Sequence, residues 1–276
     1  MKVLIIGANS YVGARLYFDI KKLYDVTGTY AHTPLSKQFV SLDITDSEAV
    51  HTVIHDTRPN VIVHVASNAN ARWCEAHPTE AKAINEHGTR YIAQAADAHN
   101  ASVIYISSFA AIKPTNVYGF TKYESEKIVK KVQNRYLILR PSFILGFSPN
   151  TTNDRPFNRL LKNLDEGTPA IYDTSWKFHP TYVGHISEVI IACLEKNIRN
   201  QVIPIAVPEM KTRFDVASDI LSPFGITVSP VDKKDATVVI TQTFSELTAL
   251  GLPTYTYTNM IRRIIDEIRN RKQFVL

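Results

Sequence analysis

The hydrophobic pattern of the first half of the chain alternates between short apolar runs and longer segments with helical spacing. Runs of strand length occupy residues 2–6, 25–30, 61–66, 102–107 and 135–140, and most of them are almost continuously apolar. Helix-like segments fill the intervals, near residues 11–23, 46–57, 78–99 and 118–133. Strands that alternate with helices predict a parallel sheet covered on both faces, and burial on both faces requires continuously apolar strands. The sequence therefore predicts a doubly wound α/β fold.

The pattern changes after residue 140, where loops that contain Pro and Asn, such as residues 149–156, separate the apolar stretches. Helical spacing returns in four segments, near residues 155–165, 184–196, 212–222 and 258–271. A chain of 276 residues can bury its core as a main domain with a smaller lobe. We expect a main domain over residues 1–147 and a smaller lobe over residues 148–276, part of which can return to the main sheet.

Two glycines bracket the turn after the first apolar run. The segment Gly7-Ala8-Asn9-Ser10-Tyr11-Val12-Gly13 joins residues 2–6 to a helix-like segment. Glycines allow a backbone to approach an anion, and the first turn of a helix offers free N–H groups and the positive end of the helix dipole. Ser10 stands where three-glycine phosphate turns carry their middle glycine, so a bare tight turn is the alternative. Because ligands of parallel sheets bind at the carboxyl ends of strands, the position favours a phosphate site.

Tyr118 and Lys122 begin the helix-like segment after the fourth apolar run. Their i, i+4 spacing puts the phenol and the ammonium on one face of a helix. A free phenol has a pKa of about 10, and a neighbouring cation lowers that pKa toward the range in which the phenol can deliver a proton at neutral pH. Ser107 and Ser108 end the fourth run, where a hydroxyl can hold a carbonyl oxygen. The alternative is a surface Tyr and Lys on an amphipathic helix, for which this spacing is common.

Composition limits the classes of partner. The net charge of +5 and the pI near 9.0 suit anionic small molecules such as dinucleotides or sugar diphosphates, although they are also compatible with solubility alone. The densest basic segment, residues 262–272, alternates cations with isoleucines as a solvated helix face does, which argues against a nucleic-acid partner. Cys74 and Cys193 give no disulfide framework, and neither a signal peptide nor a membrane-spanning run is evident. We expect a cytoplasmic protein without a membrane partner.

Several motifs occur together in an order that is specific to one superfamily. They are the segment from Gly7 to Gly13, Asp43-Ile44-Thr45, Val65-Ala66-Ser67, Asn85, Ile106-Ser107-Ser108, Tyr118-x-x-x-Lys122 and Leu139-Arg140-Pro141. In this combination the chain resembles the extended short-chain dehydrogenase/reductases, and within them it looks most like the dTDP-4-dehydrorhamnose reductase branch. The resemblance covers residues 1–147 well and is patchy beyond them, where Pro180-Thr181 and the helix from Gly184 match best.

The resemblance implies a Rossmann-type fold with a small C-terminal substrate lobe, and it implies a role for each matching residue. The residues expected at the NADPH site, with NADH as the alternative cofactor, are Gly7, Asn9, Ser10, Tyr11, Val12, Gly13, Tyr30, His32, Asp43, Ile44, Ala66, Ser67, Tyr118, Lys122 and Pro141. Among them, the segment from Gly7 to Gly13 would line the diphosphate, Asp43 and Ile44 would flank the adenine, and Ala66 and Ser67 would lie along the ribose.

For catalysis, the resemblance implies that Tyr118 is the acid, that Lys122 is its partner and a ribose contact, and that Ser108 holds the carbonyl oxygen. Ser107 is the alternative to Ser108, and Asn85 would be structural. The residues implied for the substrate pocket are Asn70, Phe143, Phe157 and Lys177.

The segment between Ser108 and Tyr118 departs from the branch in two ways. It is shorter than in the branch, so the lid carried there should be reduced or missing. Family dehydratases carry an Asp-Glu pair after the catalytic serine or threonine, whereas this chain has Phe109-Ala110. Without an acid or base at those positions, dehydration is not expected.

A metal site is not expected either. Members of the branch that dimerise through a metal carry an acidic residue two positions after the last glycine, where this chain has Arg15, and a cation repels Mg²⁺. His51 and His55 have the i, i+4 spacing of metal ligands, but no third ligand stands nearby and the segment has the pattern of an exposed helix.

The expected function is the reduction, by NADPH, of a keto group on a nucleotide-linked deoxy sugar, a step of dTDP-rhamnose and polysaccharide biosynthesis. A nucleotide-sugar epimerase with the same three catalytic side chains is the first alternative, although epimerases tend to carry a larger substrate lobe. A non-catalytic, dinucleotide-binding regulator is the second, since the regulatory subunit of methionine adenosyltransferase resembles this branch closely. The enzyme would act on a small molecule, and we expect a homodimer.

Overall fold

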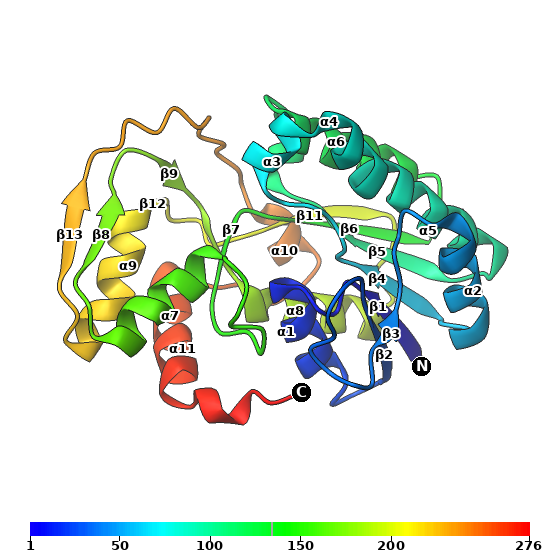
Figure 1. The fold of residues 1–276 in the computed structure, drawn as a ribbon, viewed down its shortest axis with the longest axis horizontal. Coiled ribbons are helices and arrows are strands. Elements are labelled where there is room, and N and C mark those ends of the chain that lie inside the picture. The colour runs from blue at the N-terminus through cyan, green and yellow to red at the C-terminus, as the bar shows by residue number, and fades with distance from the viewer. Residues whose placement is uncertain (134) are drawn as a thin grey trace.

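A seven-stranded parallel sheet forms the centre of the protein, as the apolar runs predicted (Figure 1). The computed structural model describes residues 1–133 and 135–276. The strands stand in the order β11-β6-β5-β4-β1-β2-β3. Their bounds are β1 Lys2–Ile6, β2 Asp25–Tyr30, β3 Val40–Ser41, β4 Val61–His64, β5 Ser102–Ile106, β6 Tyr136–Pro141 and β11 Gln201–Ile205. The order reverses direction at β1, so the carboxyl ends of β1 and β4 frame the crevice in which Rossmann folds bind ligands.

Helices cover both faces of this sheet (Figure 1). On one face lie α2 (Ser47–Thr57), α5 (Gly88–Ala98) and α6 (Val117–Val129), whose apolar side chains share a core with those of β4 and β5. On the other face lie α1 (Tyr11–Ile20), α8 (Val183–Glu195) and α10 (Ser245–Ala249). The protein therefore has the doubly wound α/β architecture that the sequence predicted.

A second core holds the smaller lobe together. It lies among three helices, α7 (Pro156–Glu166), α9 (Arg213–Leu221) and α11 (Tyr257–Arg269). The remaining strands form three pairs: β7 (Phe143–Leu145) with β10 (Pro180–Tyr182), β9 (Lys177–Phe178) with β12 (Lys211–Thr212), and β8 (Ala170–Asp173) with β13 (Val228–Val231). Between this lobe's elements, α8 and β11 return to the main sheet, where β11 pairs with β6. Helices expected near residues 155–165, 184–196, 212–222 and 258–271 are confirmed within two residues.

The helix expected over residues 78–99 is interrupted. It is built from α4 (Pro78–Lys82), a π-helical turn at Ala83–His87 and α5. A shorter helix, α3 (Ala71–Ala76), precedes it, and 3-10 turns occupy Phe109–Ala111, Ser222–Phe224 and Arg271–Gln273. The buried Asn85 lies in the π turn and donates from Nδ2 to the Asn68 carbonyl (3.0 Å) and to Thr121 Oγ1 (3.1 Å). Asn85 thus ties the loop after β4 to α6, which carries Tyr118.

Side-chain caps fix where the site-bearing helices begin. Ser10 caps α1 by accepting from the Gly13 N–H (3.0 Å), and Asn116 caps α6 by accepting from the Gly119 N–H (2.8 Å). Such caps satisfy N–H groups that have no partner within the helix. Within residues 1–133 and 135–276, no helix is both long and apolar enough to cross a membrane.

Candidate active site

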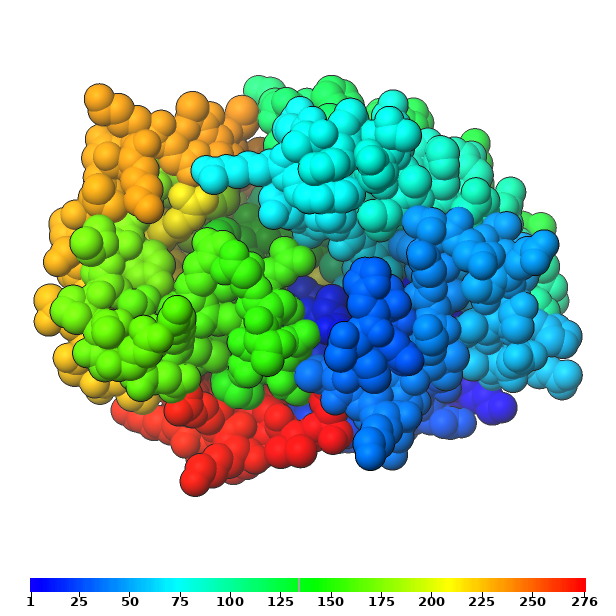
Figure 2. All heavy atoms as spheres, viewed as in Figure 1, coloured from blue at the N-terminus to red at the C-terminus, as the bar shows by residue number. Residues whose placement is uncertain are grey.

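One cavity of about 470 Å³ opens between the main domain and the smaller lobe. It is the hollow near the centre of Figure 2, where N-terminal residues in dark blue lie deep between cyan and green segments. Its walls come from the glycine turn, from the loops after β4 and β5, from α6, and from residues of the smaller lobe. The lining includes Ser10, Tyr11, Val12, Ser67, Ser107, Ser108, Lys113, Tyr118, Lys122, Phe143, Arg155, Trp176, Lys177, Phe178, Arg213, Thr237, Val238 and Ile240.

The glycine turn sits on the main-domain side of this cavity. Gly7 has a φ of +90°, and a side chain there would also bring its Cβ to 2.7 Å from the Ala66 nitrogen. A Cβ on Gly13 would lie 2.1 Å from the Gly7 carbonyl oxygen, a distance that no rearrangement of a side chain could relieve. Both positions therefore require glycine, because the turn packs closely against Ala66 and against itself, and this packing sets where Ser10, Tyr11 and Val12 meet the cavity.

Tyr118 and Ser108 both line the cavity. Ser108 follows β5, where its hydroxyl accepts from the Ala110 N–H (3.2 Å) and lies near the Tyr118 phenol. Burial raises the pKa of the Tyr118 phenol, while the nearby Ser108 hydroxyl and the charge of Arg155 act in the opposite direction. The sequence argument, in which Lys122 lowers this pKa below its usual value, is therefore wrong for the net effect. A raised pKa keeps the phenol protonated at neutral pH.

Lys122 is buried at the floor of the cavity, where its ammonium contacts the end of β5 and the loop after β4. Its ammonium donates to the Ile106 carbonyl (2.8 Å) and to Ser67 Oγ (3.5 Å), and it lies 4.5 Å from the centre of the Tyr105 ring. Burial lowers the pKa of Lys122 to about 7, although the Glu126 carboxylate opposes that fall. The ammonium is consequently close to losing its proton at neutral pH.

Ser107 and Ser108 take different positions, although they are adjacent. The Ser107 hydroxyl points inward and donates to Glu126 (2.6 Å), a buried carboxylate that also accepts two bonds from Arg140, from Nε (2.8 Å) and from a terminal nitrogen (2.6 Å). Because the Ser107 hydroxyl already donates its proton to the Glu126 carboxylate, it is not free to donate to a substrate carbonyl. Of the two serines, Ser108 is the one whose hydroxyl is not committed to Glu126 and remains available at the cavity beside Tyr118.

The cavity is cationic and has an aromatic side. Among the described residues, those that line it include Lys113, Lys122, Arg155, Lys177 and Arg213, with no Asp or Glu. Arg213 is partly neutralised from behind by Asp173 (3.3 Å) and Asp235 (2.8 Å), and its guanidinium lies 4.8 Å from the Trp176 ring. Phe143, Trp176 and Phe178 pack together beside it. The arrangement suits an anionic ligand that also carries a flat, apolar part.

The residues implied by the resemblance fall into two groups. Those that meet at the cavity are Ser10, Tyr11, Val12, Ser67, Ser108, Tyr118, Lys122, Phe143 and Lys177. Those outside the cavity lining are Gly7, Asn9, Gly13, Tyr30, His32, Asp43, Ile44, Ala66, Asn70, Pro141 and Phe157. Of the second group, Asn9 binds the loop after β2, since its amide donates to the Thr33 carbonyl (2.9 Å).

Phe157 does not belong to the substrate pocket, which corrects the sequence-based expectation. It is 0% exposed and packs in the second core with Leu160 and Leu161, because these positions of α7 share the inward face of the helix. Asn70 likewise has another task, since its side chain caps α3 by accepting from the Trp73 N–H (3.1 Å).

Sequence reasoning missed several cavity residues, namely Lys113, Arg155, Trp176, Arg213, Thr237, Val238 and Ile240. The last three belong to residues 232–244, which run without helix or strand from β13 toward α10 (Figure 1). A loop of that length in a compact fold is often functional, and this length was a signal that the sequence contained. For Arg155, its place in the loop before α7 gave no comparable signal.

The site fits a dinucleotide by the geometry of its own residues. The two glycines let the turn pack tightly against Ala66 and against its own backbone, and Ser10, Tyr11 and Val12 of the turn line the cavity where α1 begins with its free N–H groups. Cys74 lies nearby but is fully buried, and its thiol contacts the Asn68 carbonyl (3.5 Å). Within residues 1–133 and 135–276, no three His, Cys, Asp or Glu side chains are grouped so that they could hold a metal ion.

Comparison with known proteins agrees with this geometry. A dTDP-4-dehydrorhamnose reductase of Aggregatibacter actinomycetemcomitans is 29% identical over 220 residues, which cover 75% of this chain and 71% of that protein. The methionine adenosyltransferase 2 subunit beta of Mus musculus is 26% identical over 245 residues, covering 83% of this chain and 73% of that protein.

Among solved structures, a dTDP-4-dehydrorhamnose reductase from Bacillus anthracis in complex with NADP has the same fold. It superposes with a TM-score of 0.81 at 22% identity, over 96% of this chain and 99% of that one. The profile of the family described as "RmlD substrate binding domain" matches residues 1–244, which is most of the chain. The resemblance seen in the motifs is thereby confirmed, and the chain belongs to the RmlD substrate binding domain family of the extended short-chain dehydrogenase/reductases.

Proposed function

We propose that this protein is an NADPH-dependent reductase that converts a keto group on a nucleotide-linked deoxy sugar into a hydroxyl, as dTDP-4-dehydrorhamnose reductases do. One observation carries the proposal: Ser108, Tyr118 and Lys122 meet at a cavity that also contains the glycine turn and a set of cations without a lining carboxylate among the described residues. A dinucleotide and a sugar diphosphate are both polyanions, and such a cavity can hold both. The reductase in the family comparison supports the substrate class.

In the proposed reaction, Tyr118 is the general acid. A bound reduced nicotinamide supplies the hydride, and the protein supplies the proton and the geometry. Because burial raises the pKa of Tyr118, its phenol stays protonated until the keto oxygen becomes an alkoxide. Ser108 hydrogen-bonds that oxygen beforehand, and the phenolate left on Tyr118 is stabilised by the Ser108 hydroxyl and the charge of Arg155.

Lys122 serves the cofactor in this proposal. Its ammonium already shares hydrogen bonds with Ser67 and the Ile106 carbonyl, beside the floor of the cavity. Ribose hydroxyls placed there would accept from the ammonium and favour its charged form, offsetting the cost of its burial. The cofactor would thus restore a full positive charge beneath Tyr118 when it binds.

The cations of the smaller lobe suit the diphosphate of the substrate. Arg155 and Lys177 line the cavity on the lobe side, and Lys113 lines it from the loop after β5. The adjacent Trp176 and Phe143 rings offer a surface for a nucleobase or sugar ring. The identity of the sugar follows from the resemblance and not from these contacts.

NADPH is the preferred cofactor in this proposal. NAD-selective Rossmann sites usually end their second strand with an acidic residue that takes both ribose hydroxyls. Here β2 ends at Tyr30, and the residues that follow, Ala31 and the exposed His32, bring no acid. Lys37 lies further along the same loop, where a cation can face a 2′-phosphate.

The decisive experiment is to follow NADPH oxidation against a panel of nucleotide-linked 4-keto sugars. A reductase consumes NADPH in proportion to substrate. An epimerase would interconvert substrates with no net oxidation, and a non-catalytic regulator would bind NADPH without turnover. Retention of Ser108, Tyr118 and Lys122 in one cavity favours catalysis over a purely regulatory role.

A homodimer is the proposed assembly. The outer surface of α6 leaves two aromatic side chains in solvent, Phe120 at 54% exposed and Tyr123 at 41% exposed. Neighbouring exposed aromatics on one helix are a common feature of protein interfaces. Light scattering after size-exclusion chromatography should give twice the mass of the chain, and Phe120→Asp should return it to one.

A further inference from the structure

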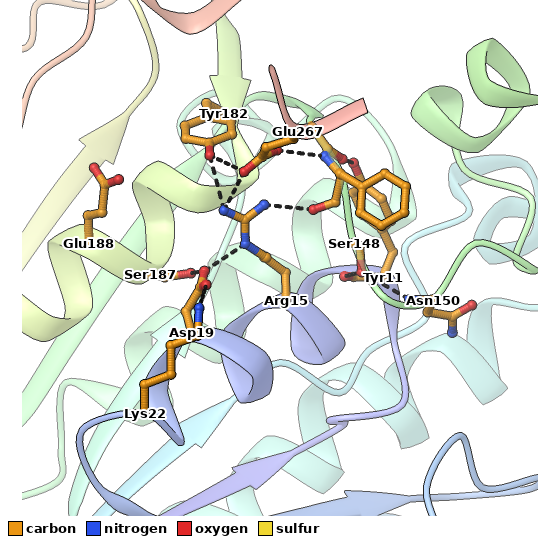
Figure 3. A network of polar contacts seen from close by, with 12 residues as sticks. Tyr11, Arg15, Asp19, Lys22, Ser148, Asn150, Tyr182, Ser187, Glu188 and Glu267 are labelled. Carbon is orange, nitrogen blue, oxygen red and sulfur yellow. Dashed lines mark hydrogen bonds and ion pairs between the residues drawn. The ribbon is translucent and has the colours of Figure 1, made fainter. Parts of the chain in front are cut away.

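A buried polar network joins the first helix of the main domain to the last helix of the chain (Figure 3). Its centre is Arg15 on α1, and its far end is Glu267 on α11; both are buried. The guanidinium lies 2.6 Å from a Glu267 oxygen and 2.6 Å from Asp19 Oδ2. It also donates to the Tyr182 hydroxyl (3.0 Å), which in turn donates to Glu267. The network therefore crosses between the two halves of the molecule.

The same two side chains hold one loop segment from both sides. Arg15 donates to the Phe147 carbonyl (2.7 Å), while the second oxygen of Glu267 accepts from the Phe147 N–H (3.1 Å). Phe147 belongs to the segment between β7 and α7. Its main chain is thus fixed by an ion pair whose members, Arg15 and Glu267 in Figure 3, come from α1 and α11.

The residues on either side of Phe147 are hydrogen-bonded directly to the glycine turn. The buried Ser148 donates to the Tyr11 carbonyl (2.6 Å), and the buried Asn150 donates from Nδ2 to the Asn9 carbonyl (2.6 Å). The Tyr11 hydroxyl donates back to the Gly146 carbonyl. Residues 146–150 therefore brace the turn that is proposed to hold the cofactor diphosphate, and they are themselves braced by the Arg15–Glu267 pair.

We propose that Glu267 is a positioning residue for the dinucleotide site, acting through Arg15 and residues 147–150 on the shape of the Gly7–Gly13 turn. The inference rests on the proposed use of NADPH. It gives the C-terminal helix, which does not line the cavity, a part in cofactor affinity.

Stability alone is a poor explanation for this pair. Burying two charges costs about as much as their attraction returns, so apolar replacements of both are often neutral for the fold. The fit is also close, since a Cβ on Gly184 would lie 2.5 Å from an Arg15 nitrogen and 2.5 Å from the Tyr182 hydroxyl oxygen. Buried charges with so little freedom specify one arrangement of the main chain around them.

The test compares NADPH affinity, by fluorescence titration, with the free energy of unfolding. For Glu267→Gln we expect the NADPH Kd to rise about tenfold, since a buried partner of Arg15 and of the Phe147 N–H is weakened. Ser148→Ala leaves the ion pair intact and removes one brace on the turn, so its Kd should rise about threefold. Ser148→Ala also serves as the test if Glu267→Gln fails to fold.

A double variant separates positioning from stability. Arg15→Met with Glu267→Met removes both charges, so its resistance to urea should approach that of the wild type, while its NADPH affinity should stay low because Phe147 has lost both contacts. The matched control is Arg271→Gln, which breaks an exposed ion pair with Asp165 (2.5 Å) just after α11. It should leave NADPH affinity unchanged.

The inference would be overturned if Glu267→Gln bound NADPH as tightly as the wild type, or if the double variant regained wild-type NADPH affinity. The outcome also stays distinct from that of the proposed reaction. A wild-type protein that binds NADPH but reduces no keto sugar would refute the reaction and leave this coupling testable. A wild-type protein that does not bind NADPH would refute both.

Discussion

Replacing Lys122 with Met should make the folded protein more stable at neutral pH. The side chain is 2% exposed, and burial of its ammonium lowers its pKa from 10.5 to about 7. In the unfolded chain the same ammonium is hydrated and keeps its proton easily. At neutral pH the fold therefore carries a destabilising contribution from Lys122 that a thioether of similar length avoids.

The magnitude follows from the difference between the two pKa values. A fall from 10.5 to about 7 corresponds, at roughly 1.4 kcal/mol for each tenfold change in proton affinity, to about 4 kcal/mol at pH 7. The variant also loses the hydrogen bond to the Ile106 carbonyl, and this loss lowers its stability by roughly 1 kcal/mol. We expect the free energy of unfolding to rise by about 3 kcal/mol at pH 7.

The pH dependence has a definite sign. Because the pKa of Lys122 is lower in the folded state, its penalty is absent above the unfolded pKa of 10.5, grows as the pH falls below that value, and is complete at about pH 7. The gain from Lys122→Met should therefore be largest near pH 7, shrink between pH 7 and pH 10.5, and be nearly absent by about pH 10. Urea titrations at pH 7, 8.5 and 10 measure the difference directly, because other titrating groups cancel between variant and wild type.

Lys127→Met is the matched control, because Lys127 lies on the same helix with its side chain 52% exposed. It should leave the free energy of unfolding nearly unchanged at each of these pH values. A Lys122→Met variant that is less stable than the wild type at pH 7, or whose gain does not vary with pH, would refute the argument. Its NADPH affinity should fall, since the same ammonium is proposed to contact the ribose.

Three further predictions concern the acid, the cofactor and the core. Tyr118→Phe should lower kcat by about 10² to 10⁴ while NADPH affinity stays near the wild-type value, because only the proton donor is lost; turnover near the wild-type rate would remove Tyr118 from the mechanism. The kcat/KM for NADPH should exceed that for NADH, and a preference for NADH would contradict the reading of the end of β2. Phe157→Ala should lower the free energy of unfolding by roughly 3 to 5 kcal/mol, because it leaves a cavity in the second core. Its KM for substrate, measured below the unfolding temperature of the variant, should be unchanged; a raised KM would show that Phe157 belongs to the substrate pocket.

The main sheet could be predicted from the sequence because each of its long strands is a continuous apolar run that has only one way to be buried. The same holds for the glycine turn and for the spacing of Tyr118 and Lys122, which are local features. The direction of the Lys122 side chain could not be predicted from local spacing, because it depends on a neighbouring strand. Its ammonium donates to the Ile106 carbonyl at the end of β5.

Side chains of the smaller lobe were harder to place. Phe157 and Arg155 lie two residues apart before and within α7, yet one is fully buried and the other lines the cavity. Helical spacing gives the face of a helix but not which neighbour that face meets. The pairing of β11 with β6 could not be predicted from local spacing either, because the chain leaves the main sheet after β6 and returns to it only at β11.

That return of the chain has a consequence for how the protein can be divided. Helix α8 covers α1, and β11 closes the edge of the sheet beside β6, yet both follow residue 147 in the sequence. A fragment ending there would leave the apolar sides of α1 and β6 in water. Exchange of the smaller lobe between relatives, whether in evolution or in a designed chimera, would therefore need at least three crossover points to spare α8 and β11. Substrate preference in this architecture is then more easily altered by replacing segments such as residues 232–244 than by exchanging a C-terminal half.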